Sequence, residues 1–511
     1  MSEAKRKKLY IVGIDSAPLW IIKNYYKKRR FGGFEHLIKD GTLMDLESTI
    51  PPMTGPSWPS IYTGYRPGDH GVPEFFKLES SYTKTLVYYD PKIKEPFWEK
   101  LARRGLKSLV ITPAMLVKPT ETKGIDMITG YPLPGRFSSK YVKEVADSHG
   151  FAGEPEIEGQ MRSGEMTLEE CSERYLEGIE ERSKVSKDLI EKKDYDLTFV
   201  CFTEQDRIQH FSLNLPNWEQ YILKLYEGVS DFLTWVERRA EREKATVMVV
   251  SDHGAQPVKE KFLINGWLIN NGSARLKQSI EQSMKAASAS GNLKYNVREK
   301  LIMSNLRKKF YYKLPKSVRQ AAKSAFEKGL SGTSGEDLTL IHDFDYDMSK
   351  TKAFASLSKC PFTMIFINDD RFDNGIVKKS EKSALKRKMI SDLRQIRDKN
   401  GRKIVTRVMD ADEYYEGTKL FITPDILVEI DRGYILDPGS FMKSGRLFAK
   451  PEIAKRGDHI QNGIFGVVSY GQKLDYNAIK RKHLYVYNIE PTVMHYFGYP
   501  PENDKRYKPI F

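Results

Sequence analysis

Aspartate and histidine residues follow three apolar runs of the sequence, at the points where strands would end. The groups are Asp15 after 8–14, Asp206 and His210 after 196–202, and Asp252 and His253 after 245–251. Asp206 and His210 are four residues apart, so on a helix they would share one face and could hold one metal ion. Ligands of open α/β sheets gather beyond the carboxyl ends of the strands. We therefore expect all five side chains at one shared site.

A loop rich in proline, glycine and hydroxyl residues, 51–64, offers a nucleophile for the same site. It contains three early hydroxyls, those of Thr54, Ser57 and Ser60. A hydroxyl near its free pKa attacks poorly, and metal coordination can activate it. Spacing alone does not choose among the three hydroxyls.

The elements that must position these residues alternate along the chain. Strands are expected at 8–14, 42–48, 107–112, 196–202, 245–251, 352–368, 425–430, 463–471 and 484–488. Helices are expected at 34–39 with a Gly41 cap, and at 97–104, 167–193, 217–243 and 381–399. This alternation predicts an α/β fold, a three-layer sandwich in which a mostly parallel central sheet is covered on both faces.

Composition excludes several classes of protein. The 511 residues are 40% hydrophobic and 12% aromatic, which excludes a wholly disordered chain. The three cysteines, Cys171, Cys201 and Cys360, are too widely spaced for a disulfide framework or a Cys-rich zinc module. The run 9–14 is too short for a signal sequence, and no stretch approaches the roughly 18 apolar residues of a membrane-spanning helix. The sequence therefore predicts a cytoplasmic protein.

Positive charge is concentrated in the segment 274–328. It contains 14 Lys and Arg residues and three Glu, a net charge of +11 out of +15 for the whole chain, and the remainder is expected to be close to neutral. One interpretation is a solvated helical surface. The other is a basic amphipathic cap that binds anionic lipid headgroups and holds the protein at the inner membrane face. Nucleic-acid binding is disfavoured, because we identify no base-stacking platform.

Six short motifs occur in a fixed order. They are Gly13 to Asp15, Pro52 to Trp58 with Thr63 to Gly71, Glu204 to His210, Ser251 to Gly254, Gly457 to His459, and Glu490 to Pro500. Together they resemble motifs of the alkaline phosphatase superfamily, in its type I phosphodiesterase/nucleotide pyrophosphatase branch. The resemblance covers about 8–270 and 340–511, and it implies an alkaline-phosphatase-like fold.

The resemblance also implies a two-metal hydrolase of phosphodiester or diphosphate bonds. Thr54 would be the nucleophile and would form a covalent phospho-threonine intermediate. One metal would be held by Asp15, Thr54, Asp252 and His253, and the other by Asp206, His210 and His459. Asp and His ligands without Cys suit Zn²⁺, with Mn²⁺ as the alternative. Gly55, Ser57 and Trp58 are the candidate substrate-binding residues.

The sequence departs from the family pattern after the nucleophile loop. Many nucleotide pyrophosphatases carry an Asn shortly after the His-Gly turn, whereas 71–76 contains none, and Ser57 stands where those enzymes often have Asn. This puts ordinary nucleotide specificity in doubt, so nucleotide-like and lipid-linked substrates both stay open. A phosphomonoesterase or phosphoryl transferase of the same superfamily is the alternative. An alternative of another class is a non-catalytic, metal-bearing protein that binds anionic lipid or polymer.

The expected domain organisation follows from the resemblance and the charge. Residues 1–272 and 336–511 would form the catalytic core, with cap elements within 336–430. Residues 273–335 would form a basic helical insertion.

Overall fold

The computed structural model describes residues 7–155, 157–277, 339–340, 346–355, 360–438, 446–451, 453–500 and 507–511. Its centre is a seven-stranded sheet in the order β2-β19-β8-β1-β7-β5-β6. These strands are β1 (Leu9–Ile14), β2 (Thr42–Glu47), β5 (Ser108–Ile111), β6 (Ile125–Ile128), β7 (Leu197–Phe202), β8 (Thr246–Val250) and β19 (Asn462–Ser469). Strand β19 runs antiparallel to β2 and β8, while β1, β5, β6, β7 and β8 are parallel, so the expected mostly parallel sheet is confirmed.

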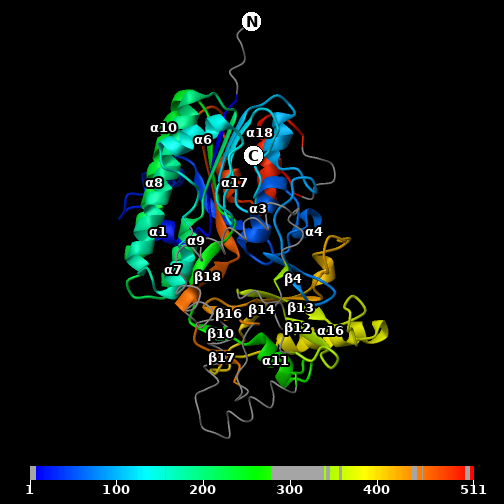
Figure 1. The fold of residues 1–511 in the computed structure, drawn as a ribbon. Helices are drawn as coiled ribbons and strands as arrows, with labels where there is room; N and C mark the ends of the chain where they lie inside the picture. Colours follow the sequence, from blue (N-terminus) through cyan, green and yellow to red (C-terminus); the bar gives the residue numbers. More distant parts are fainter. Residues whose placement is uncertain are drawn as a thin grey trace, which may run out of the picture.

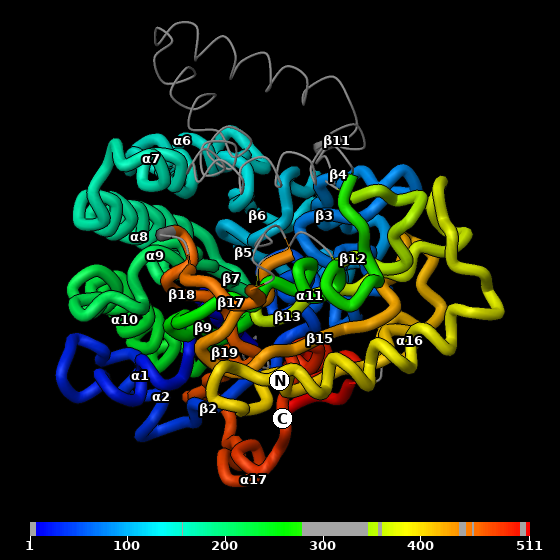
Figure 2. The backbone as a smooth tube through the Cα atoms, turned by 90° about the horizontal axis from the view of Figure 1, so that it is seen from below, coloured from blue at the N-terminus to red at the C-terminus, as the bar shows by residue number. Residues whose placement is uncertain are grey.

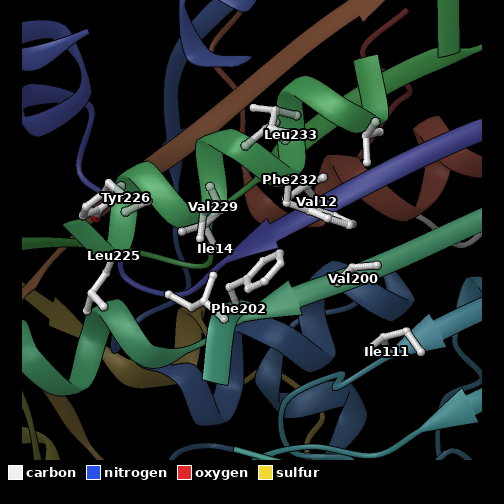
Figure 3. Packing of buried hydrophobic residues seen from close by; sticks show 14 of the residues in the cluster. Val12, Ile14, Ile111, Val200, Phe202, Leu225, Tyr226, Val229, Phe232 and Leu233 are labelled. Atoms are coloured by element: carbon white, nitrogen blue, oxygen red, sulfur yellow. The ribbon is translucent and has the colours of Figure 1, made fainter. Parts of the chain in front are cut away.

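Both faces of the sheet carry helices (Figure 1). One layer contains α1 (Leu19–Tyr25), α2 (Gly32–Asp40), α6 (Lys140–Ser148), α8 (Leu168–Lys192) and α10 (Glu219–Glu243). The other contains α3 (Thr54–Thr63), α5 (Phe97–Ala102) and α18 (Ile489–Tyr496). Side chains alternate across a strand, so Val12 and Ile14 of β1 face the first layer and Ile11 faces the second. Figure 3 shows Val12 and Ile14 beside residues of α10. The three-layer sandwich is confirmed.

A cap lies below the carboxyl ends of the parallel strands (Figure 1). Its larger sheet has the order β12-β13-β15-β14, from β12 (Ala353–Ala355), β13 (Phe362–Ile367), β14 (Val405–Asp410) and β15 (Ile426–Ile430). Helix α16 (Lys379–Leu393) runs along the outside of the cap (Figure 2). A smaller sheet has the order β16-β10-β17, from β16 (Tyr434–Leu436), β10 (Glu260–Phe262) and β17 (Phe448–Ala449). The cap has a hydrophobic core of its own.

The parallel strands and their neighbours bring the chemical side chains together between sheet and cap. Strand β1 ends at Asp15, β8 is followed by Asp252, and β7 leads into α9 (Glu204–Ser212). Strand β18 (Gly457–Ile460) pairs with β9 (Gly254–Pro257), which places His459 opposite Ala255, two residues after His253. Helix α9 and β18 lie at the end of the sheet that faces the cap (Figure 1).

Two expectations about elements were wrong in detail. Residues 484–488 are not a strand, because Val486–Asn488 form the 3₁₀-helix η3, in which Asn488 Oδ1 accepts from the Tyr485 N–H (2.7 Å). Helix α16 ends at Leu393 rather than near 399, because 397–403 form a hairpin in which Arg397 pairs with Lys403 and Gly401, with a φ of +78°, makes the turn. The expected Gly41 cap of α2 is confirmed, but with a φ of −131° rather than a left-handed conformation; a Cβ there would lie 2.3 Å from the Val467 carbonyl oxygen.

The basic insertion at 273–335 lies outside the described residues beyond Lys277, so its helical character and the domain boundaries drawn from it stay predictions. No helix within the described ranges is long and apolar enough to cross a membrane.

Candidate active site

Thr54 is the hydroxyl that the structure places among the acidic and imidazole side chains. It is the first residue of α3, where main-chain N–H groups have no partner within the helix and favour anions. Its Oγ1 donates to Asp15 Oδ1 (3.3 Å) and lies 3.5 Å from His253 Nε2. The other two hydroxyls of the loop have different partners: Ser57 bonds to Ser48 and Thr49, and Ser60 bonds to His70.

Asp15, Asp252 and His253 form the first group around Thr54. All three are fully buried. His253 Nε2 lies 3.1 Å from Asp252 Oδ2 and 3.7 Å from Asp15 Oδ1. Asp252 Oδ1 accepts from the Ser16 N–H (3.1 Å). The turns after β1 and β8 therefore aim two carboxylates and one imidazole at the nucleophile.

Asp206, His210 and His459 form the second group. Asp206 Oδ1 lies 3.4 Å from His210 Nε2 and 3.3 Å from His459 Nε2. His210 Nδ1 lies 2.9 Å from the Gly457 carbonyl oxygen, and His459 Nδ1 lies 2.9 Å from the Pro52 carbonyl oxygen. Because a carbonyl only accepts, each Nδ1 carries a proton, and a neutral ring then keeps a lone pair on Nε2. This second hydrogen bond is the usual way in which a metal-binding histidine is oriented.

The two groups are adjacent and share Asp206. The ligand atoms of Asp206, His210 and His459 all lie within 4.8 Å of one another, and so do those of Asp15, Asp206 and His253. The sequence assigned Asp206 to the second group alone. The structure thus brings together every predicted metal ligand, while the division of these ligands between two ions stays a prediction.

Burial and mutual charge shift the pKa values of these groups strongly. Burial, with the nearby Asp252 and Asp206, raises the pKa of Asp15 well above its usual range. Burial lowers the pKa of His210 to about 4. Burial opposes the positive charge of His253, but Asp252 and Asp15 outweigh it and raise its pKa to about 9. Without a metal, the cluster therefore retains protons where a cation would be favourable.

The donor set fits a divalent metal ion. Asp206 Oδ1 and Asp252 Oδ2 are buried carboxylate oxygens that face imidazole nitrogens, Asp206 Oδ1 at 3.3 and 3.4 Å and Asp252 Oδ2 at 3.1 Å. Buried carboxylates need a nearby positive charge, and a divalent cation held between these oxygens and the imidazole nitrogens would supply it. Asp and His ligands without Cys are the ligands that Zn²⁺ and Mn²⁺ accept.

Two residues have positioning roles that the sequence did not reveal. Trp58 is fully buried, and its Nε1 donates to Asp15 Oδ2 (3.0 Å). Arg207 Nη1 donates to Asp206 Oδ2 (2.7 Å), which leaves Oδ1 to face the two histidines. For Arg207, its place beside Asp206 on α9 was the available signal.

The candidate substrate-binding residues differ in their surroundings. Ser57 and Trp58 are fully buried, as Thr54 is, and their side chains bond to the partners just described, so their contact with substrate stays a prediction. Gly55 follows Thr54 at the helix start, and a Cβ there would lie 3.2 Å from both Glu74 C and Phe75 N. The segment 71–76, which lacks the expected Asn, thus closes against the nucleophile loop through its main chain. Substrate contact by Gly55 stays a prediction.

Comparisons with known proteins agree with this geometry. The sequence model of the family described as type I phosphodiesterase/nucleotide pyrophosphatase matches residues 9–443. Two similar structures are of phosphonoacetate hydrolase from Sinorhizobium meliloti 1021, in complex with phosphonoformate and with phosphonoacetate. Each shows 13% identity and a TM-score of 0.54, over 96% of this chain and 95% of that chain.

A third structure is murine ectonucleotide pyrophosphatase/phosphodiesterase 5, at 14% identity, a TM-score of 0.45 and 97% coverage of both chains. No curated protein matches the chain by sequence. The phosphonoacetate hydrolase structures share the fold of this chain. Because the family model spans most of its residues, the protein belongs to the type I phosphodiesterase/nucleotide pyrophosphatase family.

Proposed function

We propose that this protein cleaves phosphodiester or diphosphate bonds by attack of Thr54 on phosphorus, at a centre that binds two divalent metal ions. The observation that carries this proposal is the position of Thr54 Oγ1, 3.3 Å from Asp15 Oδ1 and 3.5 Å from His253 Nε2, at the start of α3. Asp15, Thr54, Asp252 and His253 would hold one ion, and Asp206, His210 and His459 the other.

The residues of this chain supply the nucleophile and its orientation. Thr54 Oγ1 forms the new bond to phosphorus, its proton leaves toward Asp15 Oδ1, and the bond from phosphorus to the leaving oxygen breaks. The main-chain N–H groups at the start of α3 face the phosphoryl oxygens. Water then cleaves the phospho-threonine and restores the hydroxyl. When bound, the metal ions supply Lewis-acid stabilisation of the charge that develops on the attacking and leaving oxygens.

We favour Zn²⁺ as the metal, with Mn²⁺ as the alternative, because the ligand set contains His and Asp and no Cys. The departures at 71–76 and Ser57 leave nucleotide-like and lipid-linked diesters as the substrate classes. Phosphonoformate and phosphonoacetate, which are bound in the structures of similar fold, both carry a phosphonate group.

The test is hydrolysis of bis-p-nitrophenyl phosphate by the Thr54→Ala protein. We expect activity to fall at least about 10³-fold while most of the bound metal, measured by atomic emission, is retained. Thr54→Ser keeps a hydroxyl and should retain measurable activity. Full activity in Thr54→Ala contradicts the proposal.

Two further comparisons separate the alternatives. Removal of metal with a chelator should abolish hydrolysis, and addition of Zn²⁺ or Mn²⁺ should restore it. A higher kcat/KM for p-nitrophenyl phosphate than for its bis ester would assign the protein to the monoesterases. A metal-loaded protein that turns over neither ester would support the non-catalytic alternative.

A further inference from the structure

A cavity separate from the candidate active site lies between the core and the cap. Its volume is about 210 Å³, and its lining consists of Gly64, Tyr65, Arg66, Gly68, Asp69, Lys94, Tyr414, Glu416, Thr418 and Tyr507. The core side is the end of α3 and the start of the short helix α4 (Pro67–His70), and the cap side is the chain after β14. Thr54 and the proposed metal ligands are absent from the described residues that line it.

Two cationic side chains of this cavity are held by neutral tyrosines. Arg66 donates from Nε (3.1 Å) and Nη2 (3.0 Å) to Tyr507 Oη, and its guanidinium lies 5.3 Å from the centre of the Tyr414 ring. The Lys94 ammonium lies 3.8 Å from the centre of the Tyr65 ring. Within the described ranges neither cation forms an ion pair with a carboxylate. Guanidinium and ammonium groups without a counter-ion are suited to an incoming anion.

Two carboxylates, those of Asp69 and Glu416, also line the cavity, and the charge of each would repel an anion. Asp69 Oδ2 accepts from the Arg66 main-chain N–H (3.2 Å) and so caps the first turn of α4. Its charge would still repel an anion in the cavity. Neutralising Asp69 should therefore strengthen the binding of an anion and weaken that of a cation. The direction of this change in affinity distinguishes the two kinds of ligand.

The cap side of the cavity is connected to the nucleophile loop. Tyr414 Oη accepts from the Ile50 N–H (3.0 Å), and Tyr415 Oη donates to the Ile50 carbonyl (3.3 Å). Ile50 lies four residues before Thr54, and the intervening Pro52 carbonyl accepts from His459 Nδ1 (2.9 Å). A ligand that contacts the Tyr414 ring would therefore contact the residue that holds this loop.

We propose that the cavity is a second binding site for a small phosphate-bearing anion, whose phosphoryl oxygens accept from Arg66 and Lys94. Arg66 and Lys94 both line a space of suitable size, and this arrangement does not depend on the function proposed for Thr54. The same phosphate group occurs in free phosphate and in a nucleoside monophosphate, and the stacking surface of Tyr414 would favour the latter.

Calorimetric titration of the full-length, metal-loaded protein with inorganic phosphate and with AMP tests the proposal. We expect two classes of site, one of which remains after the metal is removed. Arg66→Gln and Lys94→Gln should each weaken the remaining site at least about tenfold, the effect of losing one charged hydrogen bond. Lys92→Gln, which removes an exposed lysine outside the cavity, should leave it unchanged, and Asp69→Asn should strengthen it.

Three results would overturn the proposal: metal-free protein that binds neither ligand, binding that is unchanged in both Arg66→Gln and Lys94→Gln, or weaker binding in Asp69→Asn. Lys94 is only half-buried, so Lys94→Gln is expected to fold, and its circular dichroism spectrum checks this. Tighter binding of AMP than of phosphate would identify a nucleotide site, and equal binding would identify a site for free phosphate. Because binding is measured without turnover, failure here is distinguishable from failure of the proposed hydrolase function.

Discussion

Trp58 fixes the carboxylate that faces the nucleophile. Its Nε1 donates to Asp15 Oδ2 (3.0 Å), which leaves Oδ1 to accept from Thr54. The ring is stacked against Tyr62, with 5.9 Å between ring centres, so the indole cannot rotate freely. Such buried contacts commonly orient a metal ligand, and their loss typically reduces metal affinity or activity by about 10–100-fold.

Trp58→Phe should therefore lower kcat or metal affinity by about 10–100-fold, because it keeps an aromatic ring but removes the donor to Asp15. Trp98→Phe is the matched control. Trp98 is equally buried, and its Nε1 has no hydrogen-bond partner within the described residues, so the same truncation removes no hydrogen bond. Metal titration and steady-state kinetics measure both variants. Equal effects of the two substitutions would show that the bond to Asp15 does not matter.

The protonation of His253 makes a prediction for the metal-free protein. Its pKa is raised from 6.5 to about 9 in the folded state, so folding is favoured while the ring is charged. This contribution is complete below pH 6.5 and is lost as the pH rises through 9. It corresponds to a loss on the order of 3 kcal/mol in the free energy of unfolding.

Urea unfolding of chelator-treated protein at pH 6.5 and pH 9 measures this loss. Glu237 contributes to the same loss of stability between pH 6.5 and pH 9, because burial raises its pKa to about 9. The control is therefore His253→Asn, in which the pH dependence should shrink but not vanish. An unchanged pH dependence in His253→Asn would rule out His253 as its source. In metal-loaded protein, the part of this pH dependence that comes from His253 should be absent, because a bound metal replaces the proton on His253.

At the scale of elements, close contact between α9 and β18 holds the two histidines of the second group together. A Cβ on Gly457 would lie 2.2 Å from the Gln209 carbonyl oxygen and 2.9 Å from Leu213 Cβ. The Gly457 carbonyl itself accepts from His210 Nδ1. Glycine is thus required here by the closeness of a strand to a helix, and that closeness sets the distance between His210 and His459.

Gly457→Ala should push β18 away from α9, and we expect at least about a tenfold loss of metal affinity at the Asp206, His210 and His459 group, with a smaller loss at the other group. The overpacking should also lower the free energy of unfolding by about 1–3 kcal/mol. Gly466→Ala in β19 is the control, since its Cβ would meet only side-chain ends of Leu37 and Leu43 at 3.1 Å. Stoichiometric metal titration should show one weakened site in Gly457→Ala alone, and two intact sites there would contradict this account.

The central elements were predictable because their signals are local. Strands β1, β7 and β8 are unbroken apolar runs, and each is followed by a residue of the site. The order of the motifs supplied His459, which is distant in sequence from the other ligands. The 3₁₀-helix η3 was missed, because a short apolar run bounded by Tyr485 and Asn488 suits a strand equally well.

Contacts that depend on tertiary packing could not be predicted in the same way. The role of Trp58 depends on the approach of α3 to the end of β1, and that of the Pro52 carbonyl depends on β18. Neither is expressed as a spacing along the chain. The hairpin after α16 was an exception, because Asn400-Gly401 is a local turn signal that could have predicted it.

At the scale of the molecule, the positive charge is not confined to 274–328. The expectation that the rest of the chain is nearly neutral throughout was wrong. The segment 378–403 contains 11 Lys and Arg residues and three Asp and Glu, a net charge of +8 in addition to the +11 of 274–328. The rest of the chain is therefore slightly acidic. Helix α16 carries much of this second basic stretch on the outside of the cap (Figure 2). Two basic segments, not one, are candidates for contact with an anionic membrane.

The described residues on either side of 278–345 lie side by side, so a short turn can replace this stretch; the replacement also removes the two-residue strand β11 (Thr339–Leu340), which pairs with β4 (Lys84–Leu86). Leu276 pairs with Tyr346 in an antiparallel bridge, and the Asp347 N–H donates to the Arg275 carbonyl (2.9 Å). One variant would join Lys277 to Tyr346 through a short Gly-Asn turn. A second would keep the length and replace the Lys and Arg residues of 285–328 with Gln, so that a defect caused by the deletion alone is recognised.

We propose that the first segment holds the protein at the cytoplasmic membrane face, and both variants should then lose binding to phosphatidylserine vesicles, because each basic residue near such a surface contributes about 1 kcal/mol. Hydrolysis of bis-p-nitrophenyl phosphate should stay within about threefold of the parent, since the described active-site residues lie outside 274–328. The control replaces Lys378, Lys379 and Arg387 with Gln, which neutralises exposed charge of the second segment. If that control loses vesicle binding while the first two variants keep it, the membrane contact belongs to α16. Binding that does not weaken when the salt concentration is raised above about 0.15 M would exclude an electrostatic contact by either segment.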